Sequence, residues 1–313
     1  MSTASWSDWQ PLPLEWHPSP AVLAETLDGG QAFRWHRDEA DVWTGLWLDH
    51  LAQLRWRGGA VEWRAPEILR QRVAGELPRY LGREQDWPAL VDSLPWRSDP
   101  HLARCLAAYP GLRILRQPFG ETLLGFLCSA TKQIVQIKQM LALLAERHGL
   151  PQVERVDLNA LTECIDVNPF HRLPSWSQLA LIPEADLRAC QLGFRARFIH
   201  ETALFLAARP GWLGETERLP YVAAKARLLE LPGVGEKVAD CVLLFGAGKL
   251  ESFPVDTWIL KALARRYDLA GWKPAQVAQF GRAHFGPLAG LAQQFLFSWE
   301  RAQGNRASKS AAP

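Results

Sequence analysis

Residues 231–245 read LPGVGEKVADCVLLF, and this stretch decides the fold. Apolar residues recur at three- and four-residue spacing on both sides of its glycines, which predicts one helix over residues 221–230 and another over residues 236–245. A proline ends the first helix. Gly233 and Gly235 then permit the left-handed backbone and the close approach that a tight turn needs. The sequence therefore predicts two helices joined by a short hairpin.

Such a hairpin can bind an anion. The free backbone N–H groups at the start of the second helix, together with the helix dipole, form a site for a phosphate oxygen. Gly233, Val234 and Gly235 are the predicted contact residues, and they would hold DNA by its backbone without reading base sequence. Two packed helices also often meet through glycines, so the hairpin alone leaves DNA binding open.

Two ionisable residues follow the hairpin. Lys237 lies on the first turn of the second helix, where the positive end of the helix dipole favours the neutral, nucleophilic amine over the protonated form. The unperturbed pKa of lysine is about 10.4, so a nucleophile needs that value lowered. Asp256, within FPVDTW at residues 253–258, precedes the next amphipathic run. Lys237 also fits a solvated surface lysine, and Asp256 also fits a plain helix N-cap.

These two stretches closely resemble the helix-hairpin-helix, Gly-Pro-Asp DNA glycosylase superfamily, and within it the 8-oxoguanine DNA glycosylase/AP lyase family. The resemblance extends to four further stretches: GGQAFRW at 29–35, GLRILRQPFGETLLGFLCS at 111–129, LGFRARF at 192–198 and AGLAQQFLFS at 289–298. It implies an α+β fold, with an N-terminal TATA-binding-protein-like antiparallel β domain followed by a bilobal all-helical domain. The active site is then expected between the lobes.

The patterning of the chain agrees with this organisation. Short alternating runs over residues 32–62 predict antiparallel strands, and helical periodicity dominates from about residue 122. We expect a β-containing domain over residues 1–110 and the glycosylase domain over residues 111–300. The polar, small-residue tail at 301–313 is predicted to be disordered.

The resemblance implies a role for each catalytic residue. In that family the lysine matching Lys237 attacks C1′ of the damaged nucleotide, displaces the base and forms a Schiff base that permits strand cleavage by β-elimination. Asp256 would help to activate the lysine and would stabilise positive charge developing on the sugar. The base must first be flipped out, because C1′ is inaccessible in stacked duplex.

The lesion pocket follows by the same matching. Gly30 would offer its carbonyl to N7–H, a donor that 8-oxoguanine has and guanine lacks. Gln293 would hydrogen-bond the Watson–Crick edge, while Phe297 and Cys241 would contact the two faces of the base. Each residue also has a structural explanation, because Gly30 fits a turn, Phe297 a core position and Gln293 a solvated helix.

On the DNA-contact side the chain departs from its family. Phe194 matches the wedge residue that fills the gap in the base stack, and Arg195 matches an arginine that reads the orphaned cytosine. Lys132 lies where the family carries an asparagine run, and Gln136 replaces a second arginine that reads cytosine. Trp258 stands in place of a histidine that contacts phosphate. Opposite-base reading is therefore expected to be weakened.

Composition narrows the remaining functions. The 313 residues are 48% hydrophobic and carry a net charge of +2, which is typical of a globular protein. No apolar run approaches the ~20 residues that span a bilayer, and the N-terminus lacks a secretory signal, so we expect a cytoplasmic, nucleoid-associated monomer without membrane partners. Its partner would be double-stranded DNA containing damaged bases. The five scattered cysteines contain no C-x-x-C pair, so no metal or cofactor is predicted, and the fifteen tryptophans are expected mainly in the core.

Three alternatives remain at this point. A monofunctional alkylpurine glycosylase of the same superfamily would keep the aspartate without needing Lys237. An adenine glycosylase or pyrimidine-lesion endonuclease often carries a C-terminal iron–sulfur cluster, and no cysteine follows Cys241 here. A non-catalytic hairpin protein that binds DNA would require neither Lys237 nor Asp256. The pairing of these two residues favours a bifunctional enzyme that excises 8-oxoguanine and cleaves the strand.

Overall fold

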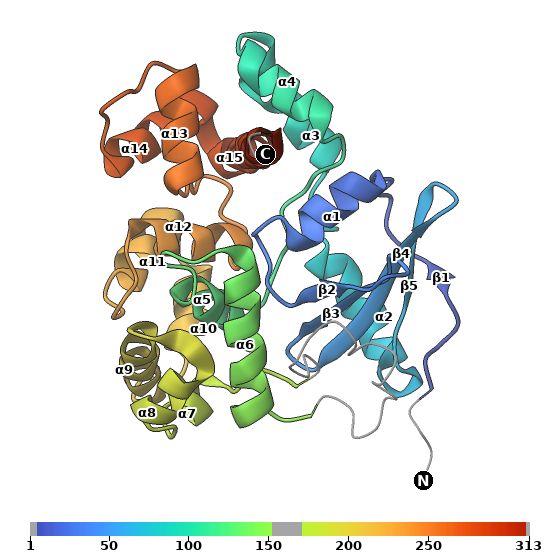
Figure 1. Cartoon of the computed structure of the whole chain (residues 1–313), viewed down its shortest axis with the longest axis vertical. Helices are drawn as coiled ribbons and strands as arrows, with labels where there is room; N and C mark the ends of the chain where they lie inside the picture. The colour runs from blue at the N-terminus through green and yellow to red at the C-terminus, as the bar shows by residue number, and fades with distance from the viewer. Residues whose placement is uncertain (1–4, 152–170, 311–313) are drawn as a thin grey trace.

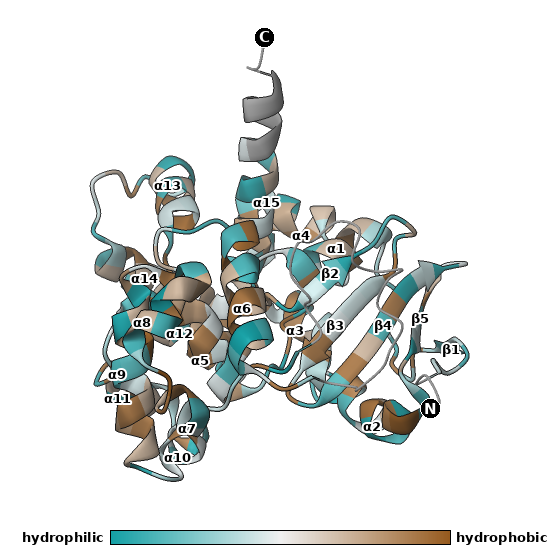
Figure 2. Ribbon diagram, turned by 60° about the horizontal axis from the view of Figure 1, so that its bottom comes forward, coloured by the Kyte–Doolittle hydropathy of each residue, from teal (hydrophilic) through white to brown (hydrophobic). Residues whose placement is uncertain are grey.

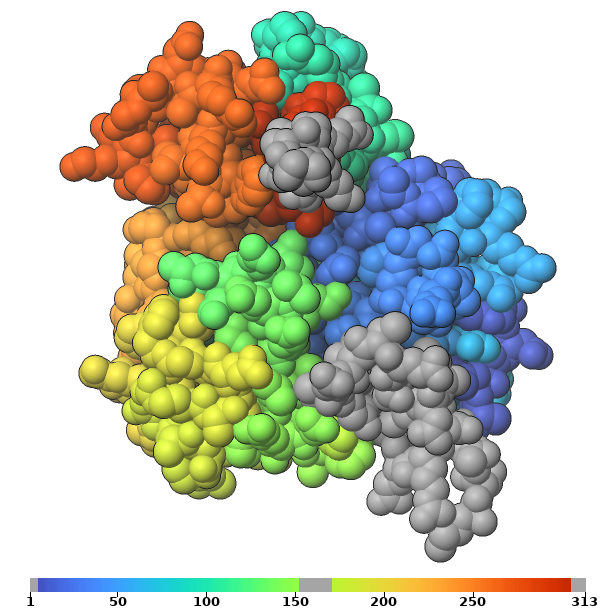
Figure 3. Space-filling view, viewed as in Figure 1, coloured from blue at the N-terminus to red at the C-terminus, as the bar shows by residue number. Residues whose placement is uncertain are grey.

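The computed structural model describes residues 5–151 and 171–310. A β domain lies beside a larger helical region whose helices form two lobes (Figure 1). In the space-filling view the N-terminal domain, in blue, lies against the green helix that begins at Ile134 (Figure 3). The expected α+β class, with a β domain before a bilobal helical region, is confirmed.

The β domain contains one antiparallel sheet in the order β1-β5-β4-β3-β2. Its strands are β1 (Gln10–Pro11), β2 (Trp35–Arg37), β3 (Trp43–Trp47), β4 (His50–Arg57) and β5 (Ala60–Arg64). The strands predicted over residues 32–62 are therefore present. Gly58 and Gly59, both at positive φ, form the tight turn between β4 and β5.

Tryptophan packing builds the core of this domain. The buried indoles of Trp16, Trp35, Trp43, Trp47 and Trp63 lie in one apolar cluster. The apolar faces of α1 (Pro20–Asp28) and α2 (Arg70–Tyr80) complete the same cluster. The expectation that the tryptophans serve mainly in packing is confirmed for these five residues.

The remaining helices enclose a second, larger core. They are α3 (Trp87–Ser93), α4 (Pro100–Ala108), α5 (Phe119–Leu127), α6 (Ile134–His148), α7 (Trp176–Leu179), α8 (Glu184–Leu187), α9 (Arg195–Ala207), α10 (Trp212–Arg218), α11 (Tyr221–Leu228), α12 (Glu236–Phe245), α13 (Thr257–Arg266), α14 (Pro274–Phe285) and α15 (Ala289–Ser310). One lobe holds α3, α4 and α13–α15, and the other holds α5–α12 (Figure 1). Hydrophobic residues, brown in Figure 2, run along α5 and parts of β4, which belong to the two cores.

The two cores do not divide the chain at residue 110. Helix α4 ends at Ala108 and packs on α15, so the helical core begins earlier in the chain. The domain boundaries assigned from sequence stay a prediction.

The expected disordered tail from residue 301 needs correction. Helix α15 continues to Ser310, and the last three residues lie outside the described part. Arg301 forms an ion pair with Glu25, and a Cβ at Gly304 would lie 2.4 Å from the Trp258 ring, so this turn packs on the body of the protein. Alanine, arginine, glutamine and lysine are also good helix formers, which a reading of hydrophobicity alone misses.

Two further expectations concern cysteines and membranes. Cys105, Cys128, Cys190 and Cys241 are buried and free, as expected for small apolar residues, whereas Cys164 lies outside the described residues. Within the described ranges, no helix has the length and apolar character required to cross a bilayer.

Asp99 connects the start of α4 to Tyr267, which follows α13, and to His284 in α14. It caps α4 by accepting hydrogen bonds from the backbone N–H groups of His101 (3.1 Å) and Leu102 (2.9 Å). Its other oxygen accepts from Tyr267 Oη at 2.8 Å and lies 3.0 Å from His284 Nε2. Burial alone would raise the pKa of Asp99, but the donors Leu102, His284 and Tyr267 hold that pKa below its usual value.

Replacing Asp99 by alanine should therefore destabilise the fold at neutral pH by about 2–4 kcal/mol, from the lost cap and the lost charged hydrogen bonds. Because the folded-state pKa is depressed, this contribution is complete above the unfolded pKa of about 4 and is lost as the pH falls further. The difference in Tm between wild type and Asp99→Ala should be larger at pH ~7 than at pH ~3. Asp92→Ala, which removes an exposed ion pair with Arg97, is the control. A difference in Tm independent of pH would contradict the assignment.

Candidate active site

The hairpin has the geometry expected of a phosphate site. Helix α12 begins at Glu236, as predicted, and its N-cap Gly235 supplies no side-chain hydrogen bond. A Cβ at Gly235 would meet nothing within 4 Å, so the approach to the first N–H groups of α12 is open. Gly233 has φ +77°, and a Cβ there would lie 2.7 Å from Phe198, so only glycine fits. The side chain of Val234 is buried, and its backbone N–H donates to the Leu231 carbonyl at 3.1 Å, so this donor is already used within the turn.

A cluster of charged residues connects the two helices on either side of the hairpin. Buried Asp240 accepts a hydrogen bond from Tyr221 Oη at 2.7 Å and pairs with Lys225 Nζ at 3.0 Å. Glu236 lies 2.6 Å from the same ammonium. Burial raises the pKa of Asp240 against the opposing charge of Lys225. Burial alone would lower the pKa of Lys225, but Asp240 and Glu236 hold it above its usual value. Asp240 is thus a structural carboxylate that joins α11 to α12.

Lys237 points instead toward the C-terminal end of α5. Its Nζ donates to Ser129 Oγ at 3.1 Å and lies 5.1 Å from the centroid of the Phe126 ring. Ser129 in turn donates its hydroxyl to the Phe126 carbonyl at 2.7 Å, which leaves its lone pairs for the lysine. Ser129 received no role from the sequence, although it lies in a stretch that carries the family resemblance.

Asp256 serves as the N-cap of α13, accepting a hydrogen bond from the Ile259 backbone N–H at 2.8 Å. Burial raises the pKa of Asp256, and this effect outweighs the lowering by the Ile259 N–H and by the positive charge of Lys237. Lys237 lies on one lobe, and Asp256 caps the start of α13 in the other. The carboxylate is therefore both a structural cap and an electrostatic partner of the lysine across the site.

The residues predicted to bind the lesion also gather here. Gly30, at φ +104°, lies against Phe297, since a Cβ there would be 3.6 Å from Phe297 Cε1. Gln293 donates its amide to the Pro254 carbonyl at 3.2 Å, and its Oε1 is buried without a hydrogen-bond partner among the described residues. Cys241 is buried, and burial raises its pKa to about 12 against the opposing charge of Lys237.

The two residues expected to face the opposite strand, Phe194 and Arg195, differ in exposure. Phe194 is 52% exposed, as a wedge requires. Arg195 is only 3% exposed, and its guanidinium donates to the Ala130 carbonyl, to the Leu192 carbonyl at 3.3 Å and to Thr131 Oγ1 at 3.1 Å. In this DNA-free structure Arg195 therefore holds the loop after α5 in place.

The other two residues predicted to contact DNA are Lys132, within that loop, and Gln136, in the first turn of α6. Gln136 Oε1 accepts the Gln133 backbone N–H at 3.1 Å in a capping box at the start of α6, so its amide oxygen is already engaged. Lys132 is exposed. Trp258, which replaces a phosphate-binding histidine of the family, packs its ring against Gly304.

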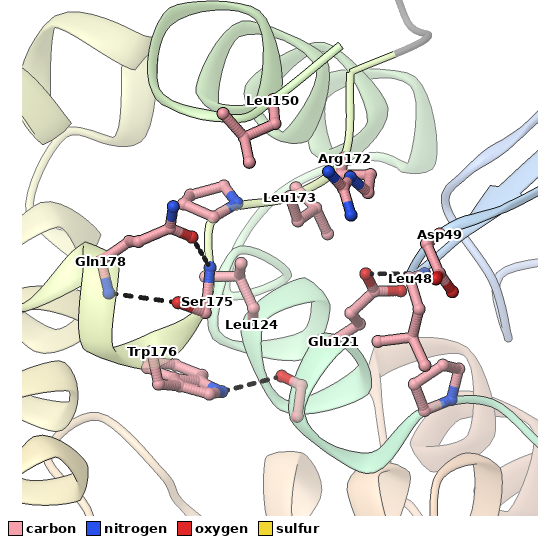
Figure 4. A pocket seen from close by; sticks show the side chains of 13 residues that line it. Leu48, Asp49, Glu121, Leu124, Leu150, Arg172, Leu173, Ser175, Trp176 and Gln178 are labelled. Carbon is pink, nitrogen blue, oxygen red and sulfur yellow. Dashed lines mark hydrogen bonds between the residues drawn. The ribbon is translucent and has the colours of Figure 1, made fainter. Parts of the chain in front are cut away.

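A cavity lies elsewhere in the molecule. This cavity of about 500 Å³ is one of those in the described part of the chain, and it lies beside the N-terminal end of α5 (Figure 4). Glu121 accepts the Leu48 backbone N–H at 3.0 Å, and Trp176 donates to the Gly120 carbonyl at 3.2 Å. Burial raises the pKa of Glu121 to about 7, against the opposing charge of Arg34. Neither proposed catalytic residue lines this cavity.

Sequence comparison identifies relatives over most of the chain. Residues 14–123 match the sequence profile of the family described as "8-oxoguanine DNA glycosylase, N-terminal domain". The N-glycosylase/DNA lyase OGG1 of Arabidopsis thaliana is 31% identical over 308 residues, which cover 92% of this chain and 79% of the plant protein. An N-glycosylase/DNA lyase of Saccharomyces cerevisiae is 29% identical over 287 residues, covering 82% and 70% of the two chains.

Solved structures of DNA glycosylases superpose on most of this chain. The 8-oxoguanine glycosylase/lyase of Clostridium acetobutylicum, in complex with double-stranded DNA containing cytosine opposite 8-oxoguanine, superposes with a TM-score of 0.79 at 29% identity, covering 90% of this chain and 92% of that chain. A 3-methyladenine DNA glycosylase from Archaeoglobus fulgidus shares the fold with a TM-score of 0.70 at 18% identity, covering 94% and 99% of the two chains.

The hairpin, with its lysine and aspartate between two lobes, defines a helix-hairpin-helix DNA glycosylase. The identity to the plant enzyme over most of both chains then places the protein in one family of that class. The chain belongs to the N-glycosylase/DNA lyase family of 8-oxoguanine DNA glycosylases.

The raised pKa of Asp256 has a consequence for stability. A carboxylate whose folded-state pKa lies above its unfolded value opposes folding at neutral pH, where it is ionised. Asp256→Asn should therefore have a Tm at pH ~7 equal to or above that of wild type, because the amide oxygen still accepts the Ile259 N–H. Asp256→Ala should be less stable than Asp256→Asn by about 1 kcal/mol, since it removes the cap. A Tm of Asp256→Asn well below wild type, measured by calorimetry, would show instead that the carboxylate stabilises the fold.

Proposed function

We propose that Lys237 and Asp256 carry out base excision and strand cleavage at 8-oxoguanine in duplex DNA. The single observation that carries this assignment is the placement of Lys237 on the first turn of α12, within the electrostatic reach of Asp256 on the facing lobe. The chain is a DNA glycosylase with AP lyase activity, and double-stranded DNA is its partner. We propose further that it acts as a monomer, since one chain supplies all of these groups. The cytoplasmic location stays a prediction.

The proposed chemistry begins with the neutral amine of Lys237. Its lone pair forms a bond to C1′ as the glycosidic bond breaks, and the base leaves with the electron pair of the glycosidic bond and takes up a proton. Loss of the amine proton and opening of the sugar ring give an iminium ion. Removal of a C2′ proton then expels the 3′ phosphate by β-elimination. Asp256 would stabilise the positive charge that develops on the sugar.

The lesion pocket would recognise the flipped base by hydrogen bonds and by contacts with its faces. Gly30 would accept N7–H of 8-oxoguanine at its carbonyl, where guanine would place an acceptor against an acceptor. The unpaired, buried Oε1 of Gln293 would accept from the Watson–Crick edge, which supports its assignment. Phe297 and Cys241 would contact the two faces.

Borohydride should trap a covalent adduct between the wild-type protein and a duplex containing 8-oxoguanine, because the lysine passes through a reducible iminium ion. Lys237→Gln should abolish this adduct. Lys225→Gln, which removes the lysine held by Asp240 and Glu236, should still form it. Normal trapping by Lys237→Gln, measured on a denaturing gel, would refute the nucleophile assignment.

The side facing the opposite strand should tolerate more than cytosine. An arginine fork can engage adjacent acceptors of cytosine, but Arg195 is buried and Gln136 caps a helix. If one good base contact contributes about 1–3 kcal/mol, the preference for cytosine should be roughly five- to 150-fold weaker than in a two-arginine relative. Gln136→Arg should restore part of it.

The measurement is single-turnover excision of 8-oxoguanine opposite each of the four bases, for wild type and Gln136→Arg. A steep wild-type preference for cytosine that Gln136→Arg leaves unchanged would mean that Lys132 or another group reads the orphaned base.

A further inference from the structure

Three helices that are far apart in the sequence converge on Gly30. It follows the end of α1 at Asp28, and a Cβ at Gly30 would lie 3.2 Å from Ile134 Cδ1 and 3.6 Å from Phe297 Cε1. Ile134 is the first residue of α6, and Phe297 lies within α15. Gly30 is therefore enclosed by one side chain from each of two other helices. In Figure 3 the blue, green and red parts of the chain meet in this region.

Each of these two helices also supplies a cation to α1. Arg301, one turn after Phe297, forms an ion pair with Glu25, and its Cζ lies 5.8 Å from the Phe297 ring centroid. Lys138, one turn after Ile134, pairs with Asp28 Oδ1 at 2.9 Å. Side chains one helical turn apart lie on the same face, so the pocket wall and its ion pair form one surface on each helix.

The pair with Glu25 is built tightly into the turn before Gly30. A Cβ at Gly29 would lie 2.5 Å from Glu25 Oε1, so the carboxylate occupies the space that a side chain would need. The side chains of Glu25 and Arg301 are only 10% and 23% exposed. Glu25 Oε1 has no hydrogen-bond partner among the described residues, so Arg301 is what balances its charge. Removing one partner of such a pair leaves a charge buried and unpaired.

We propose that the ion pairs Glu25–Arg301 and Asp28–Lys138 hold Gly30 between Ile134 and Phe297, and thereby set the width and orientation of the pocket that receives an oxidised purine. This inference rests on the proposed function. The four charged residues act as positioning residues, because they act through Gly30 and Phe297. Recognition of the base depends on a carbonyl and a ring held at fixed separation, and small displacements of such groups reduce rates strongly.

The test separates base recognition from lysine chemistry. Arg301→Gln should slow single-turnover excision from an 8-oxoguanine duplex about tenfold. It should leave borohydride trapping at a preformed abasic site within about twofold of wild type, because that substrate has no base to seat. The double variant Glu25→Gln/Arg301→Gln, in which the two amides can hydrogen-bond in place of the ion pair and no unpaired charge is buried, should recover part of the excision rate. Lys138→Met should show the same selective loss but a smaller one, since Asp28 is more exposed and can be hydrated.

Arg55→Gln is the matched control, because it breaks a half-buried ion pair with Glu62 at 2.6 Å within the sheet and should leave both activities unchanged. Wild-type excision by Arg301→Gln would overturn the inference. So would an equal loss of excision and abasic-site trapping in both Arg301→Gln and Lys138→Met, which would indicate general structural damage. A wild-type protein that neither excises nor traps would refute the proposed function instead.

Discussion

The structure depends on a carboxylate held between two helical lobes. Burial raises the pKa of Asp256, and the Ile259 N–H and the charge of Lys237 offset this effect only in part. Its place at the start of α13 fixes it by a backbone hydrogen bond, and Gln293 from α15 holds the Pro254 carbonyl just before it. The lobes must therefore stay closely packed, and both share one apolar core. The raised pKa of Asp256 lowers stability at neutral pH, which is consistent with its proposed role of stabilising positive charge on the sugar.

The same hairpin carries two lysines with opposite surroundings. Lys225 lies between Asp240 and Glu236 and is held protonated, which ties α11 to α12. Lys237 contacts a neutral hydroxyl, Ser129. The carboxylate partners of Lys225 make it a structural cation, whereas Lys237 has the Ser129 hydroxyl as its hydrogen-bond acceptor and is the proposed nucleophile. The contact partners, more than the residue type, separate the two roles.

Local features of this protein were predictable from sequence, and contacts between distant segments were not. Helix periodicity and two glycines located the start of α12 correctly, because both are properties of neighbouring residues. The family resemblance assigned Gly30 and Phe297 to one pocket, but their direct packing was not predicted. The ion pair between Glu25 and Arg301 had no local signal. The helical turn at residue 301 was missed because the good helix formers in this segment were not weighed and because its packing on α1 and Trp258 is not local.

We propose that the amine of Lys237, and not that of another lysine, forms the covalent bond with the sugar. Peptide mapping by mass spectrometry, after borohydride reduction of the wild-type protein with an 8-oxoguanine duplex and nuclease digestion, locates that bond. We expect the reduced sugar on Lys237, in the peptide that contains the start of α12. A sugar found on Lys225, Lys132 or any other lysine, with Lys237 unmodified, would contradict it.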